Sequence, residues 1–314
     1  MKILVTGGAG FIASNLVDKL ISLGHDVVIV DNLSTGKTEN INPRATFYKE
    51  DICNAKGLEK IFSKEKPDIV NHHAAQVDLR RSVKEPTYDA QVNILGSLNL
   101  IELSNKYNIR KFIYISTGGA IYGEPKYLPA DEKHPIEPLS QYGVSKHTVE
   151  HYLFVSEQTH GLNYTVLRYP NVYGPRQDPH GEAGVVAIFS ELMLDGKQPT
   201  IFGDGAKTRD YVYVDDLINA NVIVMFNPAN SQGEFYNLGW GKEVKDIEIF
   251  EAVRDALGLK IKPIYDKKRP GEIDHICLDS AKATKQLHWK PEVKLKEGIK
   301  LTTNFYKKRR QQTS

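Results

Sequence analysis

Tyr142 and Lys146 stand four residues apart in a segment with helical character. Residues spaced by four lie on the same face of a helix, so the two side chains point the same way. A tyrosine with its ordinary pKa of about 10 is a poor base at neutral pH. A lysine ammonium nearby favours the phenolate and lowers that pKa, so Tyr142 is a candidate acid/base for a substrate hydroxyl. The same spacing also arises by chance on helix surfaces, so the pair needs support from its surroundings.

Two small hydroxyl residues, Ser116 and Thr117, follow an apolar segment that predicts a strand over 111–116. The carboxyl end of a central parallel strand faces the crevice in which α/β proteins bind ligands. Either hydroxyl could therefore bond the substrate oxygen on which Tyr142 acts. The alternative interpretation is ordinary turn chemistry at a strand end.

A glycine-rich turn lies between the first predicted strand, 2–6, and a helical pattern over 11–22. Gly7 permits a tight turn, and Gly10 lets the backbone approach a pyrophosphate at the positive end of the helix. Asp31 ends the next strand and is placed to accept hydrogen bonds from ribose hydroxyls. Because its carboxylate would repel a 2′-phosphate, NAD is favoured over NADP, with nearby Lys37 as the contrary sign. The alternative is a tight turn in an α/β protein that binds no nucleotide.

The elements that must position these residues alternate along the first half of the chain. Short apolar strands separated by helices predict an α/β fold with a doubly wound parallel sheet and a second, smaller mixed α/β domain. We predict a dinucleotide-binding domain over 1–170 and a substrate domain over 171–314, with 203–250 returning to the first domain. The predicted strands are 2–6, 27–31, 46–49, 68–72, 111–116 and 163–168, and the main helices are 11–22, 87–106, 141–160, 184–195 and 215–226.

Composition excludes several classes of protein. The net charge of +2 over 314 residues gives no reason to expect nucleic acid or a charged membrane surface as a partner. The two cysteines, Cys53 and Cys277, have no metal-ligand spacing and suit a reducing cytoplasm, and we expect both to be packing residues, with Cys277 possible as a pocket residue. No apolar run reaches the length of a membrane span, and no signal peptide is expected. The basic run 307–310 predicts a solvated, fraying helix end.

Taken together, these motifs resemble the extended short-chain dehydrogenase/reductase family, and within it the UDP-glucose (UDP-galactose) 4-epimerases. The resemblance runs nearly end to end. Beyond the motifs above, it rests on the segments 31–36, 51–52, 73–77, 93–96, 116–123, 168–175, 202–205, 208–212 and 269–272. The tyrosine–lysine pair and the glycine turn are typical of the whole superfamily, whereas the later segments are typical of the nucleotide-sugar branch.

The resemblance implies roles position by position. The catalytic residues would be Tyr142, Lys146, Thr117 and Ser116. The residues implied for NAD are Gly7, Gly10, Phe11, Ile12, Asp31, Asn32, Ser34, Thr35, Gly36, Asp51, Ile52, Ala74, Ala75, Gln76, Asn93, Ser116, Tyr142, Lys146 and Tyr169. The residues implied for the nucleotide sugar are Thr117, Gly118, Asn171, Val185, Phe189, Thr200, Phe202, Arg209, Arg269 and Glu272. No metal site is expected.

For two of the implied binding residues, Arg209 and Arg269, the residue type itself also indicates phosphate binding, without reference to the family. Guanidinium groups bind phosphate oxygens in paired hydrogen bonds, as a diphosphate requires. A structural ion pair of Arg209 with Asp210 or Asp215 is the alternative, and these aspartates and Asp216 are expected to cap the helix near 215–226.

The chain departs from the resemblance at Gly118, where many epimerases carry the catalytic serine or threonine. The hydroxyl must then come from Thr117 or Ser116, and we choose Thr117.

The implied function is interconversion of UDP-galactose and UDP-glucose by inversion at C4, through a transient 4-keto sugar and NADH. A 4,6-dehydratase is disfavoured, because its family carries Asp-Glu where this chain has Gly118-Gly119. Epimerases of UDP-GlcNAc or UDP-GlcA and a UDP-glucuronate decarboxylase stay open, since the pocket near Ile276 and Cys277 is expected to set sugar size. A non-catalytic NAD-binding protein and a plain alcohol dehydrogenase are the remaining alternatives.

The resemblance also implies a cytoplasmic homodimer. The subunits would meet through the helices 87–106 and 141–160. Their outer apolar residues would then be interface contacts, whereas core packing is the alternative that the sequence leaves open: Leu98, Ile101, Tyr152 and Val155.

Overall fold

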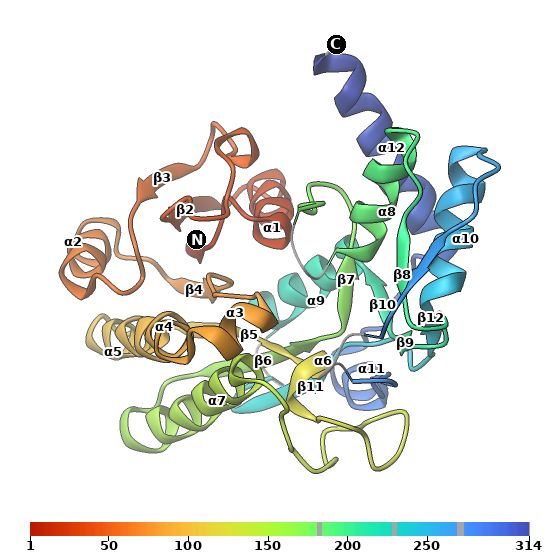
Figure 1. Ribbon diagram of the computed structural model, residues 1–314. Helices are drawn as coiled ribbons and strands as arrows, with labels where there is room; N and C mark the ends of the chain where they lie inside the picture. The colour runs from red at the N-terminus through yellow and green to blue at the C-terminus, as the bar shows by residue number, and fades with distance from the viewer. Residues whose placement is uncertain (181–183, 228–230, 269–272, 314) are drawn as a thin grey trace.

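The computed structural model describes residues 1–180, 184–227, 231–268 and 273–313. A parallel seven-stranded sheet in the order β11-β6-β5-β4-β1-β2-β3 runs through the molecule (Figure 1). Its strands are β1 (Lys2–Thr6), β2 (Asp26–Asp31), β3 (Thr46–Lys49), β4 (Ile69–His72), β5 (Lys111–Thr117), β6 (Tyr164–Tyr169) and β11 (Glu234–Asn237). The predicted fold class is confirmed, and the six predicted strands are present within one residue at each end.

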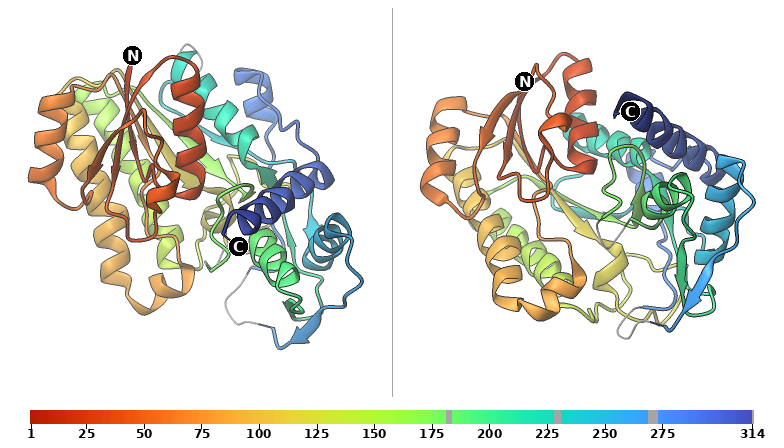
Figure 2. Two further views of the ribbon diagram at one scale, coloured as in Figure 1. Left: turned by 90° about the horizontal axis from the view of Figure 1, so that it is seen from above. Right: turned by 45° about the horizontal axis from the view of Figure 1, so that its top comes forward.

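Helices cover both faces of this sheet (Figure 2). Ile3 and Val5 pack in one buried cluster with α1 (Phe11–Ser22) and α9 (Val214–Phe226). The alternate residue, Leu4, packs in a second cluster with α2 (Ala55–Glu65), α5 (Gly96–Lys106) and α7 (Gln141–His160). Because both faces are buried there, the inner residues of β1 and β2 form continuous apolar runs. Each fully buried aliphatic side chain stabilises the fold by about 1.5–3 kcal/mol relative to exposure.

The segment predicted as one helix over 87–106 is divided. It consists of α4 (Pro86–Ala90), a π-helical segment over Gln91–Leu95, and α5, and it is preceded by α3 (Leu79–Lys84). The prediction of one regular helix was therefore wrong at 91–95. The π-helical segment carries Asn93, which is buried, and such turns are frequent at functional sites.

The remaining strands form three two-stranded sheets. β7 (Asn171–Tyr173) pairs in parallel with β10 (Tyr211–Tyr213), and β8 (Thr200–Phe202) pairs in parallel with β13 (Ile264–Asp266). β9 (Thr208–Arg209) pairs with β12 (Val244–Lys245) in the antiparallel sense. The accompanying helices are α8 (Val185–Leu194), α10 (Asp246–Leu257), α11 (Ala281–Leu287) and α12 (Leu295–Thr313), and the short α6 (Gly118–Ile121) follows β5.

Two elements from the second half of the chain belong to the large sheet. Helix α9 packs on α1, and β11 pairs with β6 at the edge of the sheet. The chain therefore passes from the large sheet to the smaller sheets and back again. The predicted domain boundary between residues 170 and 171 lies where the chain first leaves the large sheet.

The basic end of the chain is anchored. Arg309 and Arg310 on α12 each form an ion pair with Glu191 of α8, at 3.0 and 2.6 Å, and Arg310 also pairs with Asp195 at 2.5 Å. The prediction of a solvated, fraying end was therefore wrong for these two arginines. Among the described helices, none has both the length and the apolar character to cross a membrane.

Candidate active site

The order of the large sheet reverses direction between β1 and β4, and the glycine turn lies at that point. Gly7 follows β1 with φ of +68°, and a β-carbon there would lie 2.9 Å from the backbone nitrogen of Ala74. Ala74 is in the loop after β4, so the two loops that diverge from the reversal point touch at Gly7. Ligands of open α/β sheets bind in the crevice at such a point.

Helix α1 begins at this crevice without a side-chain cap. Gly10 is its N-cap, with φ −81° and ψ 176°, and among the described residues no side chain caps this end and no acid stands in its first turn. The first N–H groups of α1, including those of Phe11 and Ile12, are therefore free for an anion. Together with the closeness of Gly7 to Ala74, this fits the pyrophosphate of a dinucleotide.

The carboxylate of Asp31 stands at the end of β2 and is buried. Its Oδ2 accepts the N–H of Ala9 at 3.0 Å, and its Oδ1 accepts the N–H of Leu33 at 2.8 Å. Each oxygen keeps a second lone pair, so the group can hold the turn and still accept a ribose hydroxyl. A β-carbon at Gly36 would lie 2.8 Å from Asp31 Oδ1, which explains a glycine at that position.

The other residues implied for the adenosine end lie in neighbouring loops. Asn32 Nδ2 donates to Asp51 Oδ2 at 2.8 Å, and Asp51 Oδ1 accepts the N–H of Cys53 at 2.8 Å. Ser34 and Thr35 are exposed beside Asn32, whereas Ile52 is buried in the core. The structure therefore brings Asn32 and Asp51 together and uses Ile52 for packing.

The loop after β4 is braced by a buried polar cluster. Asn93 Oδ1 accepts the N–H of Gln76 at 2.8 Å, and Asn93 Nδ2 donates to the carbonyl of Gln76 at 2.9 Å. Asp89 is fully buried and accepts from the side chains of Gln76, Asn93 and Ser145 at 3.1, 3.0 and 2.7 Å. Asn93 thus holds the backbone next to Ala74 and Ala75 in place. Sequence reasoning missed Asp89, because no motif marks it.

His73, in the same loop, is a second residue that sequence reasoning did not single out for a role. Its Nε2 is buried, and it has no hydrogen-bond partner among the described residues. Its ring lies 6.4 Å from that of Tyr169, which is buried at the end of β6. Burial lowers the pKa of His73 to about 3, with the charge of Lys146 acting in the same direction. A neutral imidazole with an unused nitrogen beside the crevice further fits a bound polar ligand.

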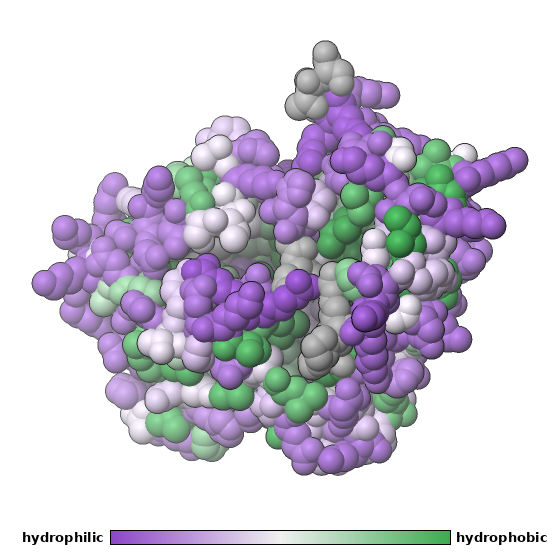
Figure 3. Space-filling view, in the orientation of Figure 1, coloured by the Kyte–Doolittle hydropathy of each residue, from purple (hydrophilic) through white to green (hydrophobic). Residues whose placement is uncertain are grey.

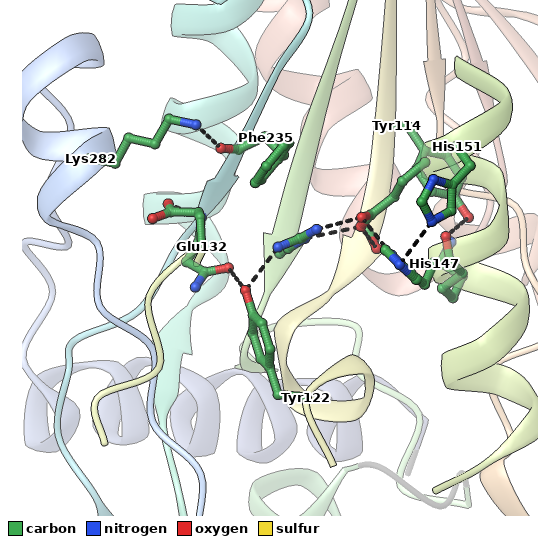
Figure 4. Close-up of polar contacts among 12 residues, drawn as sticks. Tyr114, Tyr122, Glu132, His147, His151, Phe235 and Lys282 are labelled. Carbon is green, nitrogen blue, oxygen red and sulfur yellow. Dashed lines mark hydrogen bonds and ion pairs between the residues drawn. The ribbon is translucent and has the colours of Figure 1, made fainter. Parts of the chain in front are cut away.

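The two hydroxyls at the end of β5 have different partners. Ser116 is buried and donates to Glu150 Oε1 at 2.6 Å (Figure 4). The hydroxyl of Thr117 lies near the phenol of Tyr142 and acts to lower its pKa. A β-carbon built at Gly119 would lie 3.8 Å from Thr117 Oγ1 and 3.7 Å from Asn171 Oδ1, so these two groups border one open space. Thr117 therefore borders this space beside Tyr142, whereas Ser116 is bonded to Glu150.

Gly118 does not leave room for a side chain. A β-carbon there would lie 2.3 Å from Cδ1 of Leu278. The backbone at Gly118 packs directly against the side chain of Leu278, at the position where the resemblance leads us to expect a hydroxyl in other epimerases. Ile276 and Cys277, just before Leu278, are buried, and burial raises the pKa of the Cys277 thiol to about 12.

Tyr142 and Lys146 lie one turn apart near the start of α7, as predicted. The ammonium of Lys146 is buried and lies 4.4 Å from the centre of the Tyr114 ring. Burial lowers the pKa of Lys146 to about 7, although Glu150 and Asp89 act to raise it. Burial, followed by the charge of Asp89, raises the pKa of Tyr142 above its ordinary value, whereas the nearby hydroxyl of Thr117 acts to lower it. The expected lowering of this pKa by Lys146 is thus not found in the chain alone.

The residues implied for the nucleotide sugar lie on the small sheets. Arg209 is half-buried on β9 and donates to the carbonyls of Thr208 and Asp274 at 2.7 and 3.4 Å. Thr200 and Phe202 lie on β8 and are half-buried. Asp210 accepts backbone N–H groups of Trp240, Gly241 and Leu278 at 3.0, 3.0 and 3.1 Å, so its expected role as a helix cap was wrong.

Four further residues for which the sequence predicts a binding or capping role lie within the described part of the chain. Val185 begins α8 and is half-buried, whereas Phe189 is buried in the core with its ring 6.0 Å from that of Phe250. Asp215 and Asp216 lie in the first turn of α9, and Asp216 Oδ2 accepts the N–H of Val293 at 3.1 Å. Asp216 therefore ties α9 to the segment before α12. Arg269 and Glu272 lie outside the described residues.

Known proteins resemble this chain over almost its whole length. A family model described as the NAD dependent epimerase/dehydratase family matches residues 3–239. A putative UDP-glucose 4-epimerase of Methanocaldococcus jannaschii is 50% identical over 97% of this chain and 98% of that protein. A UDP-glucose 4-epimerase of Mycolicibacterium smegmatis is 42% identical over 99% and 100%. The chain therefore belongs to the NAD dependent epimerase/dehydratase family.

Solved structures agree closely with the fold. A UDP-glucose 4-epimerase of Thermotoga maritima, solved with UDP-glucose, has a TM-score of 0.96 and 49% identity, covering 98% of this chain and 99% of that one. The UDP-glucose 4-epimerase of Thermus thermophilus, in complex with NAD, has a TM-score of 0.92 and 43% identity over 98% and 99%. A UDP-N-acetylglucosamine 4-epimerase of Methanobrevibacter ruminantium has a TM-score of 0.92 and 36% identity over 98% of each chain.

Proposed function

We propose that this protein interconverts UDP-galactose and UDP-glucose by inverting C4 of the hexose, with NAD as its cofactor. The observation that carries the proposal is the position of Tyr142 one helical turn from the buried Lys146 on α7, with the hydroxyl of Thr117 near the phenol. This places a phenol, a hydroxyl and an ammonium beside a dinucleotide crevice. Relatives at 42–50% identity that carry this activity in their names support the choice of substrate.

The chemistry is divided between the cofactor and the chain. When bound, NAD supplies a reversible hydride acceptor for C4. Tyr142 takes the proton from the 4-hydroxyl and later returns it, while Thr117 holds the same oxygen. Because the phenol of Tyr142 has a raised pKa in the chain alone, the positive charge of Lys146 and of the oxidised ring are needed to make it a base.

Inversion also requires the 4-keto sugar to turn within the site without leaving it. Arg209 and Phe202, with Arg269 as the second expected arginine, would hold the UDP group by its diphosphate and its base. Binding energy placed on UDP keeps the sugar bound while leaving the hexose free to rotate. Asn171, which borders the same space as Thr117, would contact the sugar or the diphosphate.

The packing at Gly118 argues against dehydration. Expelling the 6-hydroxyl requires an added acid at the positions after Thr117. An aspartate at Gly118 would collide with Leu278, whose Cδ1 lies 2.3 Å from the place of its β-carbon. The chain therefore has neither the acid nor the room for one at this position.

A substrate panel tests the proposal. Purified protein with NAD is incubated with UDP-galactose, UDP-GlcNAc or UDP-GlcA, and the products are separated by chromatography. We expect UDP-glucose from UDP-galactose with no net release of NADH. Conversion of UDP-GlcNAc at a higher kcat/KM would assign the second sugar class instead, as in the structural relative with that name. The Tyr142→Phe variant is the control, and activity above a few per cent of the wild-type rate in it excludes Tyr142 as the base.

We also propose that the protein forms a homodimer through α7 and the neighbouring helical segments over 87–106. Tyr152 and Val155 on α7 and Leu95 beside it are 44–55% exposed, although they are large apolar residues. Apolar residues lie among polar ones on this part of the surface, at the lower left of Figure 3. Ile101, predicted as a contact, is 4% exposed and belongs to the core, and Leu98 is half-buried against it. Mass measurement by light scattering tests this, with Tyr152→Lys expected to give monomers.

We place the enzyme in the cytoplasm. Cys53 and Cys277 are both free thiols, as a reducing compartment allows. Cell fractionation with an antibody to the protein would test this location.

A further inference from the structure

Glu150 continues the line of catalytic side chains on α7. Tyr142, Lys146 and Glu150 are spaced by four residues, so they follow one another along the buried side of the helix. Glu150 is 8% exposed. It is the third titratable group of this line, and neither the motifs nor the proposed chemistry gives it a role.

The carboxylate of Glu150 is bonded from three elements. Arg168 on β6 donates to it through Nε at 3.0 Å and Nη2 at 2.5 Å, and Ser116 on β5 donates at 2.6 Å. On its own helix, His147 Nδ1 lies 3.0 Å from Oε2. Burial alone would raise the pKa of Glu150, but these bonds and the charge of Arg168 lower it to about 2. The group is therefore a carboxylate at every physiological pH.

The contacts continue beyond Arg168 (Figure 4). Arg168 Nη1 donates to the hydroxyl of Tyr122 at 2.9 Å, and this hydroxyl donates to Asn237 Oδ1 at 2.7 Å. Tyr122 follows α6, and Asn237 ends β11. The network thus joins α7, which begins at the candidate site, to the ends of β5, β6 and β11.

The outer end of the network reaches the surface. His147 has a side chain that is 24% exposed, and its Nε2 lies 3.1 Å from Nε2 of His151, the next exposed residue on this face (Figure 4). Solvent therefore meets the network only through these histidines among its described members, while Glu150, Arg168 and Ser116 are buried.

We propose that Glu150 is a positioning residue: it fixes the end of β5 against α7, so that Thr117 stays within hydrogen-bond reach of Tyr142. Ser116, which Glu150 holds, is the neighbour of Thr117 in the chain. A shift of the end of β5 would part the hydroxyl from the phenol, and small displacements of reacting groups cost large factors in rate. The proposal rests on the proposed function for its readout in turnover.

Glu150 also bears on the charge of Lys146, one turn away. The charged or titratable groups that interact with Lys146 are Asp89 of α4, His72 and His73 of the β4 end, Tyr114 of β5, and Glu150 of its own helix, on which Tyr142 also lies. Among them Glu150 and Asp89 favour the ammonium form. Removing the charge of Glu150 should therefore lower the pKa of Lys146 and move the alkaline limb of kcat to lower pH.

The experiment compares Glu150→Gln with Glu157→Gln in the NAD-loaded protein. Glu157 lies on the same helix but outside the network, so it is a matched control. We expect Glu150→Gln to lower kcat about tenfold to a hundredfold, with KM for UDP-galactose nearly unchanged, and to shift the alkaline limb. Ser116→Ala, which breaks only the contact to β5, should lower kcat in the same direction without that shift.

Two further measurements keep the test decisive. Because an unpaired Arg168 can unfold the protein, the double variant E150Q/R168M removes both buried charges together and should also show the lowered kcat. Hydrogen exchange at the amides 116–118 needs no substrate and should become faster in Glu150→Gln but not in Glu157→Gln. A folded Glu150→Gln protein with wild-type kcat, pH profile and exchange overturns the positioning role. Absence of epimerisation by the wild type overturns the proposed function alone, since the exchange result still decides the role of Glu150.

Discussion

The side chain of Leu278 occupies the place where a side chain at position 118 would stand, with its Cδ1 2.3 Å from the β-carbon position of Gly118. Leu278 is itself fully buried, in a cluster with Ile121, Tyr122 and Ile276. Leu278, from the C-terminal part of the chain, thus forms the wall of the candidate site beside Gly118.

Gly118→Ser should therefore destabilise the protein. We expect the free energy of unfolding to fall by about 1–3 kcal/mol, because the added side chain overpacks a filled region. The double variant Gly118→Ser/Leu278→Ala should recover part of this loss relative to the sum of the single variants. Denaturant unfolding of the four proteins completes the cycle, and strictly additive effects would contradict the packing relationship.

Gly7→Ala should weaken both stability and NAD binding. The residue has φ of +68°, and its β-carbon would lie 2.9 Å from the nitrogen of Ala74. Gly24→Ala is a matched control, because Gly24 has φ of +82° but no atom within 4 Å of its β-carbon. We expect about 1 kcal/mol of destabilisation for Gly24→Ala and more for Gly7→Ala. Calorimetric titration with NAD should show a loss of affinity for Gly7→Ala alone; equal behaviour of the two variants would exclude the crevice at Gly7.

The charge of Lys146 should make the stability of cofactor-free protein depend on pH. Its pKa is about 7 in the folded chain and 10.5 when unperturbed. Between these values the unfolded chain binds a proton that the folded chain does not, so the free energy of unfolding rises with pH in this window. Below about pH 7 Lys146 is charged in the folded chain, so the whole cost of burying that charge lowers the free energy of unfolding. Lys146→Met should flatten this rise by up to about 1.4 kcal/mol per pH unit.

Urea unfolding of wild type and Lys146→Met at several pH values from 7 to 10 checks this prediction. The buried Lys111, whose pKa burial also lowers to about 7, contributes equally to both proteins and cancels in the difference. Parallel curves for the two proteins would show that Lys146 keeps its ordinary pKa.

We expect the side chain of Asp89 to contribute strongly to the free energy of unfolding, although it belongs to no sequence motif. Asp89→Ala leaves the donors of Gln76, Asn93 and Ser145 without their acceptor, and we expect a loss of about 3 kcal/mol in the free energy of unfolding. Asp89→Asn keeps an acceptor oxygen and should cost less. It should still move the alkaline limb of kcat to lower pH, because the charge that favours the ammonium of Lys146 is gone.

Ser145→Ala is the control for Asp89. It removes one hydrogen bond, of 2.7 Å, but keeps the carboxylate. We expect about 1 kcal/mol of destabilisation and an unchanged pH profile. A pH profile that moves equally in Ser145→Ala and Asp89→Asn would attribute the effect to packing.

Local patterns predicted the large sheet and the nucleotide end of the site. The glycine turn and Asp31 depend on neighbours within one strand–helix–strand unit, and the spacing of Tyr142 and Lys146 depends on a single helix. Both are therefore visible in the sequence alone. The break at Gln91–Leu95 was not, because a π-helical segment has no distinct pattern of residue types.

The sequence alone did not predict contacts between segments that are far apart in the chain. Ile101 looked like an outer residue of its helix, yet it is buried, because a helix lying on a sheet hides more than one row of side chains. Arg310 looked unpartnered, yet its partner Glu191 is 119 residues away. Glu150 and Asp89 each gather donors from several elements, and only the folded chain shows which.

The return of α9 and β11 to the large sheet has a consequence for how the molecule can be taken apart. A polypeptide ending at Pro170 would lack the strand beside β6 and the helix packed on α1. Its sheet would have a bare edge, and the apolar residues of α1 and β5 that α9 covers would face water. The two halves must therefore fold together as one cooperative body, and any opening of the crevice must come from bending at the crossings rather than from separation of two independent globules.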